Sequence, residues 1–234
     1  MSETLHLAII PDGNRRWAKL HGKSIPEGHK AGIDKLKDVV EWCRDIGVTT
    51  LSIWIFSTEN ASRSKEEVES LYKLFEEMLN RIENSKELEQ LRTKARVRFI
   101  GRMSIFPKHI IERAKAVEAK TNQDAKFTVA ILCGYGGRQE IVDATNRIIS
   151  DAKGGKIGAV DEKTFSSYLY APDISDPDLV FRSSGEKRLS GLLPWQTVYS
   201  EFYFCEKLWP DITKEDLNTA ISEFKSRKRR FGKG

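Results

Sequence analysis

The sequence has little cysteine and no long apolar run. Its 234 residues include three cysteines, Cys43, Cys133 and Cys205, and none has the CxxC spacing of a zinc or redox site. We therefore expect buried free thiols in a reducing compartment. No run approaches the roughly 20 apolar residues of a membrane span, and the N-terminal apolar run is too short for a signal peptide. These absences predict a cytoplasmic protein that at most touches a membrane surface.

The sequence also lacks a broad basic face, although its net charge is +5. The excess of basic residues is in the tail, at Lys225, Arg227, Lys228, Arg229, Arg230 and Lys233. This distribution argues against nucleic acid as a partner. The length predicts one domain over residues 1–234. It ends in a basic C-terminal arm, 225–234, which we expect to meet a phosphate, an anionic lipid or another subunit.

Strand-like and helix-like stretches alternate along the chain. Six short apolar runs have the composition of strands: 5–10, 50–56, 95–101, 127–133, 178–182 and 201–205. Helical spacing of apolar residues marks the stretches 28–47, 64–82, 107–120, 138–150 and 213–224. The alternation predicts an α/β fold, a single domain with a central, mostly parallel six-stranded sheet flanked by helices. We expect the charged stretch 81–96 to be the exposed end of the helix that begins at Ser64.

Polar residues directly follow four of the predicted strands. The clusters are Asp12 to Arg16, Ser57 to Asn60 with Arg63, Gly134 to Arg138, and Ser183 to Ser190. Because the carboxyl ends of parallel strands share one edge of the sheet, we expect these clusters to converge on one cleft. Several guanidiniums, a carboxylate and short polar side chains suit a highly charged anion with a divalent metal. A diphosphate fits this set better than a carboxylate substrate does.

Several other phosphate-binding and catalytic motifs are incomplete. The segment 21–24 resembles the end of a P-loop, but Trp17 stands where that motif needs glycine. The segment 134–139 begins as a dinucleotide fingerprint but ends in Gln139. No G-x-S-x-G motif makes Ser183 or Ser184 a hydrolase nucleophile. No Asp-Asp pair occurs, which excludes the aspartate-rich metal motif of the helical prenyl-transferring enzymes.

Five segments together resemble the cis-prenyltransferase family of the undecaprenyl diphosphate synthase type. They are HLAIIPDGNRRWAK at 6–19, FSTENASRSKEEV at 56–68, GYGGRQEIVDA at 134–144, DPDLVFRSSGEKRLSGLLPWQTVYSEFYF at 176–204 and LWPD at 208–211. The resemblance runs from about residue 6 to residue 232. It implies the family's fold, a homodimer and an enzyme that uses Mg²⁺. The implied reaction condenses isopentenyl diphosphate with an allylic prenyl diphosphate, forms a Z double bond and releases diphosphate.

The resemblance also assigns roles around the allylic substrate. Asp12 matches the catalytic, metal-linked carboxylate that helps the allylic diphosphate to leave. Catalytic Asn60, together with Ser57, stands at a position where the family's residues hold the reacting carbons and the proton that is lost. The implied substrate-binding residues near the first strand are Gly13, Asn14, Arg15, Arg16, Trp17 and His29. Those near the second strand are Thr58, Glu59 and Arg63.

A second set of roles concerns isopentenyl diphosphate and a partner subunit. Arg182, Arg188 and Ser190 resemble the family's isopentenyl diphosphate clamp. Glu201 resembles the carboxylate that reaches the metal region, an arrangement that a second subunit can supply. Arg230 and Gly232 resemble the C-terminal Arg-x-Gly arm that completes the neighbouring active site.

Four positions depart from the bacterial long-chain members of that family. Ala61 replaces a tryptophan beside the allylic substrate, Ile25 replaces an arginine before His29, and Lys187 replaces a frequent histidine. Ile55 stands where a small residue is often found before the FSTEN segment. A larger side chain there predicts a product of short to medium length. The long helix that begins at Ser64 argues for a longer product.

Three alternatives are compatible with parts of the sequence. The same fold could couple two dimethylallyl diphosphate units head to middle, a reaction that Ala61 and Ile25 leave open. A non-catalytic subunit of a cis-prenyltransferase complex would keep the fold, but the intact Asp12, Arg182 and Arg188 argue against it. A regulatory phosphate-binding module would bind diphosphates without turning them over.

Overall fold

The fold is built on one parallel sheet. The computed structural model describes residues 4–62, 64–84 and 89–227. The strands are β1 (His6–Ile10), β2 (Thr50–Ser57), β3 (Ala95–Ile100), β4 (Phe127–Tyr135), β5 (Leu179–Arg182) and β6 (Glu201–Phe204). All neighbouring strands pair in parallel, in the order β3-β4-β2-β1-β5-β6. The predicted α/β fold with a six-stranded parallel sheet is confirmed.

The strand order creates a switch point between β1 and β5. After β1 the chain moves to one side of the sheet, where it lays down β2, β3 and β4, and it then crosses to the other side for β5 and β6. Ile10 pairs in register with Arg182, so the carboxyl ends of β1 and β5 lie next to each other. The connections leave these neighbouring strands in opposite directions, which opens a crevice where ligands bind in α/β sheets.

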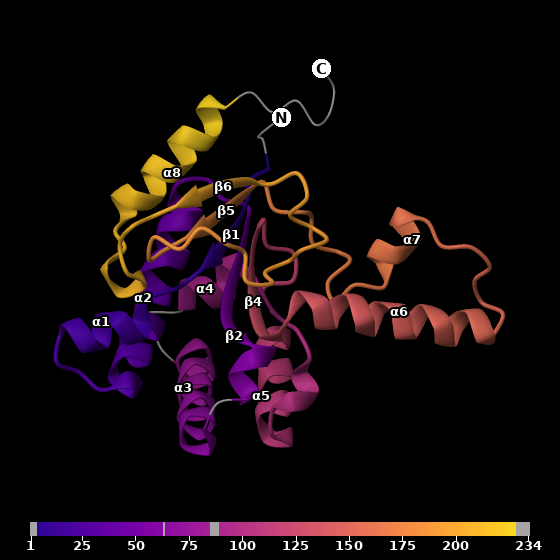
Figure 1. Ribbon diagram of the computed structural model, residues 1–234, viewed down its shortest axis with the longest axis horizontal. Helices are drawn as coiled ribbons and strands as arrows, with labels where there is room; N and C mark the ends of the chain where they lie inside the picture. Colours follow the sequence, from indigo (N-terminus) through magenta and orange to yellow (C-terminus); the bar gives the residue numbers. More distant parts are fainter. Residues whose placement is uncertain (1–3, 63, 85–88, 228–234) are drawn as a thin grey trace.

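One face of the sheet carries most of the long helices (Figure 1). These are α2 (Ile25–Asp45), α3 (Lys65–Asn84), α5 (Lys108–Ala119) and α8 (Lys214–Ser226). Their apolar stripes face the sheet: Val39 and Phe75 belong to the same buried cluster as Ile53 and Ile131 of the strands. Burying these stripes supplies the main stabilising free energy of the fold.

The other face is covered mainly by loop segments. Leu192, Leu193, Tyr170 and Ile174 pack there on a smaller apolar cluster that includes Ala130 and Leu132 of β4. α6 (Gly137–Lys153) and α7 (Glu162–Ser167) project from this side of the molecule (Figure 1).

Two helix boundaries differ from the predictions. α2 begins at Ile25, before the predicted residue 28, because Ser24 and Glu27 form a capping box and Pro26 occupies the first turn. The stretch 81–96 is not simply the end of one helix. α3 ends at Asn84, a separate helix α4 (Glu89–Lys94) follows, and β3 starts at Ala95.

The three cysteines behave as expected. Cys43, Cys133 and Cys205 are free thiols with buried side chains. Burial raises the pKa of Cys43 and of Cys133 far above the usual range, so both thiols stay protonated and unreactive. Among the described residues, no helix combines the length and the apolar character needed to cross a membrane.

Candidate active site

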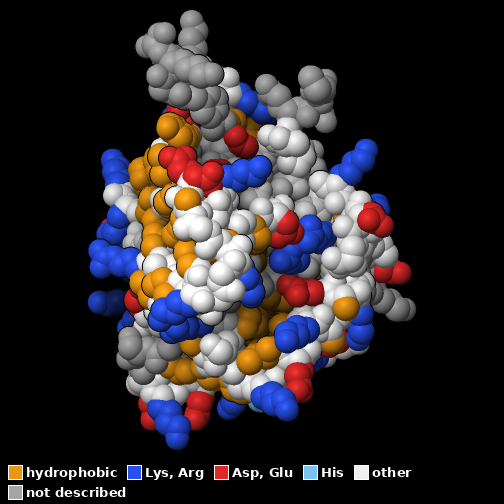
Figure 2. Space-filling model, turned by 90° about the vertical axis from the view of Figure 1, so that its right-hand side faces the viewer, with side chains coloured by type: hydrophobic (Ala, Val, Ile, Leu, Met, Phe, Trp, Pro, Cys, Tyr) orange, Lys and Arg blue, Asp and Glu red, His pale blue; other side chains and the backbone are white. Residues whose placement is uncertain are grey.

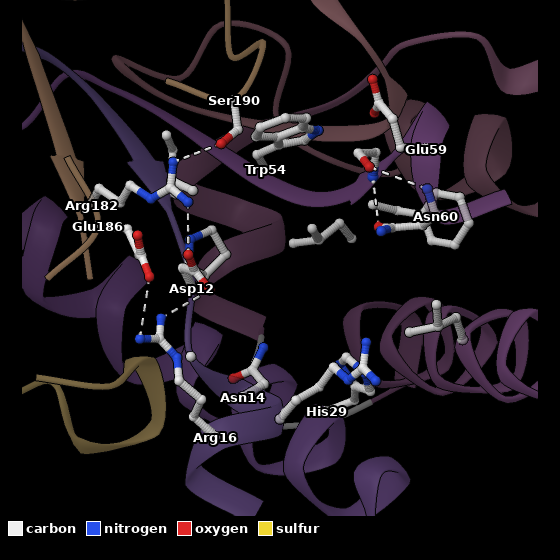
Figure 3. Close-up of a pocket in the computed structure, with 18 of the residues that line it drawn as sticks. Asp12, Asn14, Arg16, His29, Trp54, Glu59, Asn60, Arg182, Glu186 and Ser190 are labelled. Carbon is white, nitrogen blue, oxygen red and sulfur yellow. Dashed lines mark hydrogen bonds and ion pairs between the residues drawn. The ribbon is translucent and has the colours of Figure 1, made fainter. Parts of the chain in front are cut away.

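A cleft of about 650 Å³ lies at the carboxyl edge of the sheet, beside the switch point. Many of the predicted site residues line it: Asp12, Gly13, Asn14, Arg15, Arg16, His29, Ser57, Glu59, Asn60, Arg182, Arg188 and Ser190. They come from β1, α1 (Asn14–Leu20), α2, β2, the 3₁₀ turn η1 (Thr58–Ser62), β5 and the loop after β5. Three of the four predicted clusters therefore meet in one cavity (Figure 3).

The fourth cluster, 134–138, is not among the residues that line the cleft. β4 continues through Tyr135, whose side chain is fully buried in the cluster on the second face. The amide of Gly137 donates to the carbonyl of Gly191 at 3.0 Å, so this segment braces the loop that carries Ser190. The expectation that all four clusters converge is wrong for this one, because Tyr135 packs in the cluster on the second face and Gly137 is hydrogen-bonded to the loop at Gly191.

The central contact is an ion pair across the switch point. Arg182 donates from Nη2 to Oδ2 of Asp12 at 2.7 Å and from Nη1 to Oγ of Ser190 at 2.9 Å (Figure 3). Arg182 is only 3% exposed, and its Nη1 also donates to the carbonyl of Arg188. One guanidinium thus fixes the carboxylate after β1 and the loop after β5 at the same time.

Asp12 is held as a carboxylate. Burial by itself would raise the pKa of Asp12, but the hydrogen bond and charge of Arg182, with the charge of Arg16, outweigh it and leave this pKa lowered. Ser183 Oγ accepts from the amide of Asp12 at 2.9 Å and donates to its carbonyl at 2.7 Å. The backbone of the carboxylate is therefore fixed as well as its charge.

Gly13 and Gly28 allow the packing around this carboxylate. Gly13 has a φ of +110°, and a Cβ there would lie 2.8 Å from the side chain of Leu208. A Cβ at Gly28 would meet the carbonyl oxygen of Asn14 at 2.5 Å, so α1 can lie directly on α2. The resemblance implies that Gly13 contacts the substrate. The close neighbour that the structure shows is Leu208.

A second set of charges lies toward the mouth of the cleft. Arg16 lies 3.7 Å from Oδ1 of Asp12 and 3.5 Å from Oε1 of Glu186, and Arg188 donates to Glu186. Arg16 and Arg188 are substantially exposed, so an incoming anion can reach both guanidiniums. Sequence reasoning missed Glu186, which lies inside a recognised motif and lines the cleft.

Ser57 and Asn60 form a reciprocal turn at the end of β2. The amide of Ser57 donates to Oδ1 of Asn60 at 2.9 Å, and the amide of Asn60 donates to Oγ of Ser57 at 3.3 Å. These two bonds fix the side chains of both residues at the cleft wall (Figure 3). His29 faces them from α2 and lies 3.8 Å from Glu67 of α3.

The apolar part of the cleft was only partly predicted from the sequence. Trp54, Ile55 and Phe56 of β2 all line the cavity, together with Leu71 of α3. Register shifts against β4 occur on either side of Phe56, so β2 is bulged here. A bulge turns consecutive residues toward one side, which strict alternation would not do. Of these four residues, sequence reasoning singled out only Ile55 as a cleft residue.

Six predicted site residues are not among the cleft-lining residues. Trp17 donates to Asp211 at 2.8 Å and stacks on His21, and Thr58 packs against Gly136. Glu201 starts β6 at the amino edge of the sheet and accepts from Arg227 at 2.7 Å, so this chain does not bring it to Asp12. The other three, Arg63, Arg230 and Gly232, lie outside the described residues.

Comparison with known proteins decides the family. The family model described as "Putative undecaprenyl diphosphate synthase" matches residues 10–232. The chain is 46% identical over 228 residues to an isoprenyl transferase of Thermotoga maritima, across 97% of this chain and 96% of that one. The chain belongs to the undecaprenyl diphosphate synthase family.

Further relatives of this cis-prenyltransferase differ in their named products. The geranylgeranyl-diphosphate-specific tritrans,polycis-undecaprenyl-diphosphate synthase of Methanopyrus kandleri is 43% identical, across 97% of this chain and 84% of that one. Lavandulyl diphosphate synthase from Lavandula x intermedia, solved with dimethylallyl diphosphate, superposes with a TM-score of 0.89 at 32% identity, across 97% and 98% of the two chains. The predicted family, and with it prenyl transfer that extends Z-prenyl chains, is confirmed.

Proposed function

We propose that this cis-prenyltransferase adds isopentenyl diphosphate to an allylic prenyl diphosphate bound in the cleft, and releases diphosphate. The observation that carries the proposal is the pairing of Asp12 with Arg182 at the polar end of a cavity whose other arm is lined by Ile55, Phe56 and Leu71. A polar end suits diphosphates, and an apolar arm suits a prenyl tail, whose burial is favourable by about 0.8 kcal/mol per CH₂.

Two anion subsites follow from the arginines. Arg182, Arg188 and Ser190 are linked by hydrogen bonds on the β5 side, and we assign them to isopentenyl diphosphate. Arg15 and Arg16 lie on α1 at the β1 side, and we assign them, with Asn14 and His29, to the allylic diphosphate. Donors aimed at the departing oxygens stabilise the charge that develops when the allylic C–O bond breaks.

The lining charges support a need for Mg²⁺. Four arginines and three carboxylates, Asp12, Glu59 and Glu186, line the cleft, so these charges nearly cancel before two diphosphates enter. Oδ1 of Asp12 lies 3.7 Å from Arg16, outside hydrogen-bonding distance. No group of three His, Cys, Asp or Glu among the described residues forms a metal cage. This fits Mg²⁺, which binds through one or two carboxylates and substrate phosphates, and whose charge would stabilise the leaving diphosphate.

Asn60 and Ser57 are proposed to hold the reacting carbons. The oxygen of the Asn60 amide accepts from the backbone of Ser57, which leaves its NH₂ group for the substrate. As the allylic C–O bond breaks, diphosphate leaves with the electron pair and the double bond of isopentenyl diphosphate forms the new C–C bond. The proton lost from the new chain passes to the released diphosphate. A fixed turn at this point favours reaction by holding the reactants in line.

A homodimer is proposed from exposed apolar side chains on α6 and in the segment before β6. Val142 and Ile149 on α6, with Val198 and Tyr199 before β6, are exposed apolar side chains, Val198 at 69% and Tyr199 at 65%. Figure 2 shows hydrophobic side chains gathered in a band on the side from which α6 projects. Exposed patches of this kind mark interaction surfaces. A second subunit packed there would cover them and bring an outside residue, such as a partner's Glu201 or 225–234 arm, toward a cleft.

The test is incubation with Mg²⁺, labelled isopentenyl diphosphate and a series of allylic primers from dimethylallyl to geranylgeranyl diphosphate. Discrete elongated products are expected, and they should disappear with EDTA and in Asp12→Asn. If folded protein incorporates no label with any primer, the proposal fails. A branched product from dimethylallyl diphosphate alone would favour head-to-middle coupling, and diphosphate binding without turnover would favour a non-catalytic role.

A further inference from the structure

Two helices that border the cleft are tied together by ion pairs outside it. His29 of α2 and Leu71 of α3 both line the cavity. One turn further along each helix, Ile33 and Phe75 pack into the core, and the cleft-lining residues stop. Leu74 and Met78 of α3 are also buried at this point. A prenyl tail longer than the cleft can therefore advance along this seam only if α2 and α3 move apart.

Four charged residues cross the same seam on its outer side. Arg81 of α3 donates to Oδ1 of Asp34 on α2 at 2.5 Å and to Oε1 of Glu77 on its own helix at 2.6 Å. Lys30 of α2 donates to the same oxygen of Glu77 at 2.8 Å and lies 3.9 Å from Asp34. Each helix thus donates one cation to a carboxylate on the other. We name Lys30, Asp34, Glu77 and Arg81 the α2–α3 clasp.

The spacing of these residues explains why they act together. Lys30 and Asp34 are four residues apart on α2, and Glu77 and Arg81 are four apart on α3, so each pair shares one helix face. Their side chains are 38–46% exposed, and isolated pairs with that exposure contribute little. Here a guanidinium contacts two carboxylates and an ammonium shares one of them, which makes a closed network.

We propose that the α2–α3 clasp sets the spacing of the two helices and thereby limits the length of the prenyl product. The inference rests on the proposed elongation reaction. It deepens that proposal by naming specificity-determining residues that touch neither diphosphate nor the reacting carbons. Each added isoprene unit pushes the tail further into the seam, and the clasp opposes the separation that the tail requires.

Partial exposure makes the clasp sensitive to salt. The screening length falls from about 10 Å at 0.1 M ionic strength to about 3 Å at 1 M. High salt is expected to weaken the clasp and to shift the products toward longer chains. The length distribution is the quantity to compare, because salt also slows the binding of diphosphates and so changes the rate.

The experiment measures product lengths for wild type, Arg81→Glu and the charge-swapped double variant Asp34→Arg/Arg81→Glu at low and high KCl. Arg81→Glu faces Asp34 and Glu77 with a third carboxylate, and its products should be longer by at least one isoprene unit at low salt. The double variant should return to wild-type lengths. Glu77→Gln, a milder change, should give an intermediate shift and serves if Arg81→Glu does not fold.

The matched control is Arg113→Glu. Arg113 of α5 donates to Glu83 of α3 at 2.9 Å, so it ties the same helix to a different neighbour and away from the α2 seam. This control should keep wild-type lengths and the wild-type response to salt. Unchanged lengths in both Arg81→Glu and Glu77→Gln, from a wild type that does elongate primers, would overturn the inference. A wild type that incorporates no label would instead overturn the proposed function.

Discussion

Arg182 is the residue on which the geometry of the site depends most. It is buried, and it reaches Asp12, Ser190 and the carbonyl of Arg188 from one planar group. Ser190 has a φ of +52°, in a region that residues with side chains seldom adopt. The hydrogen bond from Arg182 helps to hold that strained loop in place, so the guanidinium serves both as a charge and as a brace.

Arg182→Lys keeps the charge and removes the brace. A lysine ammonium is a single point and cannot replace the fork that joins Asp12 to the Ser190 loop. We expect kcat/KM for isopentenyl diphosphate to fall by roughly tenfold to a hundredfold, since a charge-assisted hydrogen bond contributes about 1.5–3 kcal/mol. Steady-state kinetics check this. Arg96→Lys is the control, because Arg96 pairs with Asp173 and is not among the cleft residues. An equal loss in both variants would contradict the role.

His6 provides a prediction about pH and stability. Burial lowers the pKa of His6 to about 4, although the Ser175 carbonyl and the Asp178 charge act to raise it. In the unfolded chain this pKa is about 6.5, so between the two values the unfolded state binds more protons. This contribution to stability is complete above about pH 6.5 and is lost as the pH falls toward 4, by roughly 3 kcal/mol.

Urea unfolding at pH 7, 6 and 5 measures the effect of His6. The wild type should lose stability across this range, and His6→Gln should show a shallower pH dependence. Parallel curves for the two proteins would mean that His6 is not the group responsible. The two proteins are compared by the slope of the unfolding free energy against pH. Its absolute value also changes, because the substitution removes the contacts of His6 with Ser52 and Ser175.

At the scale of the elements, the bulge in β2 shapes the wall of the cleft in which we propose that the prenyl tail lies. Ile55 lies between Trp54 and Phe56, and all three line the cleft. Ile55→Ala removes bulk from this wall, so we expect longer products than those of the wild type. Sizing labelled products checks the change, with Val160→Ala, on the exposed segment between α6 and α7, as a control. A product distribution unaffected by Ile55→Ala would place the length limit elsewhere.

The boundaries of the helices and strands show which parts of the fold could be predicted from the sequence. All six strands were located to within one or two residues, because short apolar runs bounded by polar clusters are unambiguous when helices alternate with them. The start of α2 was misplaced because its capping box at Ser24 was overlooked. Trp54 and Phe56 were missed because a bulge depends on pairing with β4, which local spacing does not reveal. The convergence of Asp12 and Arg182 could be predicted because both stand at the carboxyl ends of parallel strands, which share one edge of the sheet.

At the scale of the whole molecule, the proposed dimer surface can be tested by placing charges in it. The change Val198→Asp with Tyr199→Asp would place two charges in the exposed apolar patch beside β6. We expect the variant to be monomeric by light scattering while the wild type is dimeric, and to keep the wild-type circular dichroism spectrum. Dimers that persist in this variant would exclude the patch as the interface. Lys108→Glu with Lys115→Glu on α5 serves as the charge-changing control.

The separation of Asp12 and Arg182 in the sequence also affects when the site can form during translation. Asp12 and Arg182 are separated by 170 positions, yet they lie side by side at the edge of the sheet. On a ribosome, β1 through β4 can form before β5 has emerged, and until then Asp12 faces no guanidinium from that strand. A nascent chain therefore cannot capture a diphosphate through this pair. In the proposed function, this part of the substrate site can therefore form only once β5 has emerged.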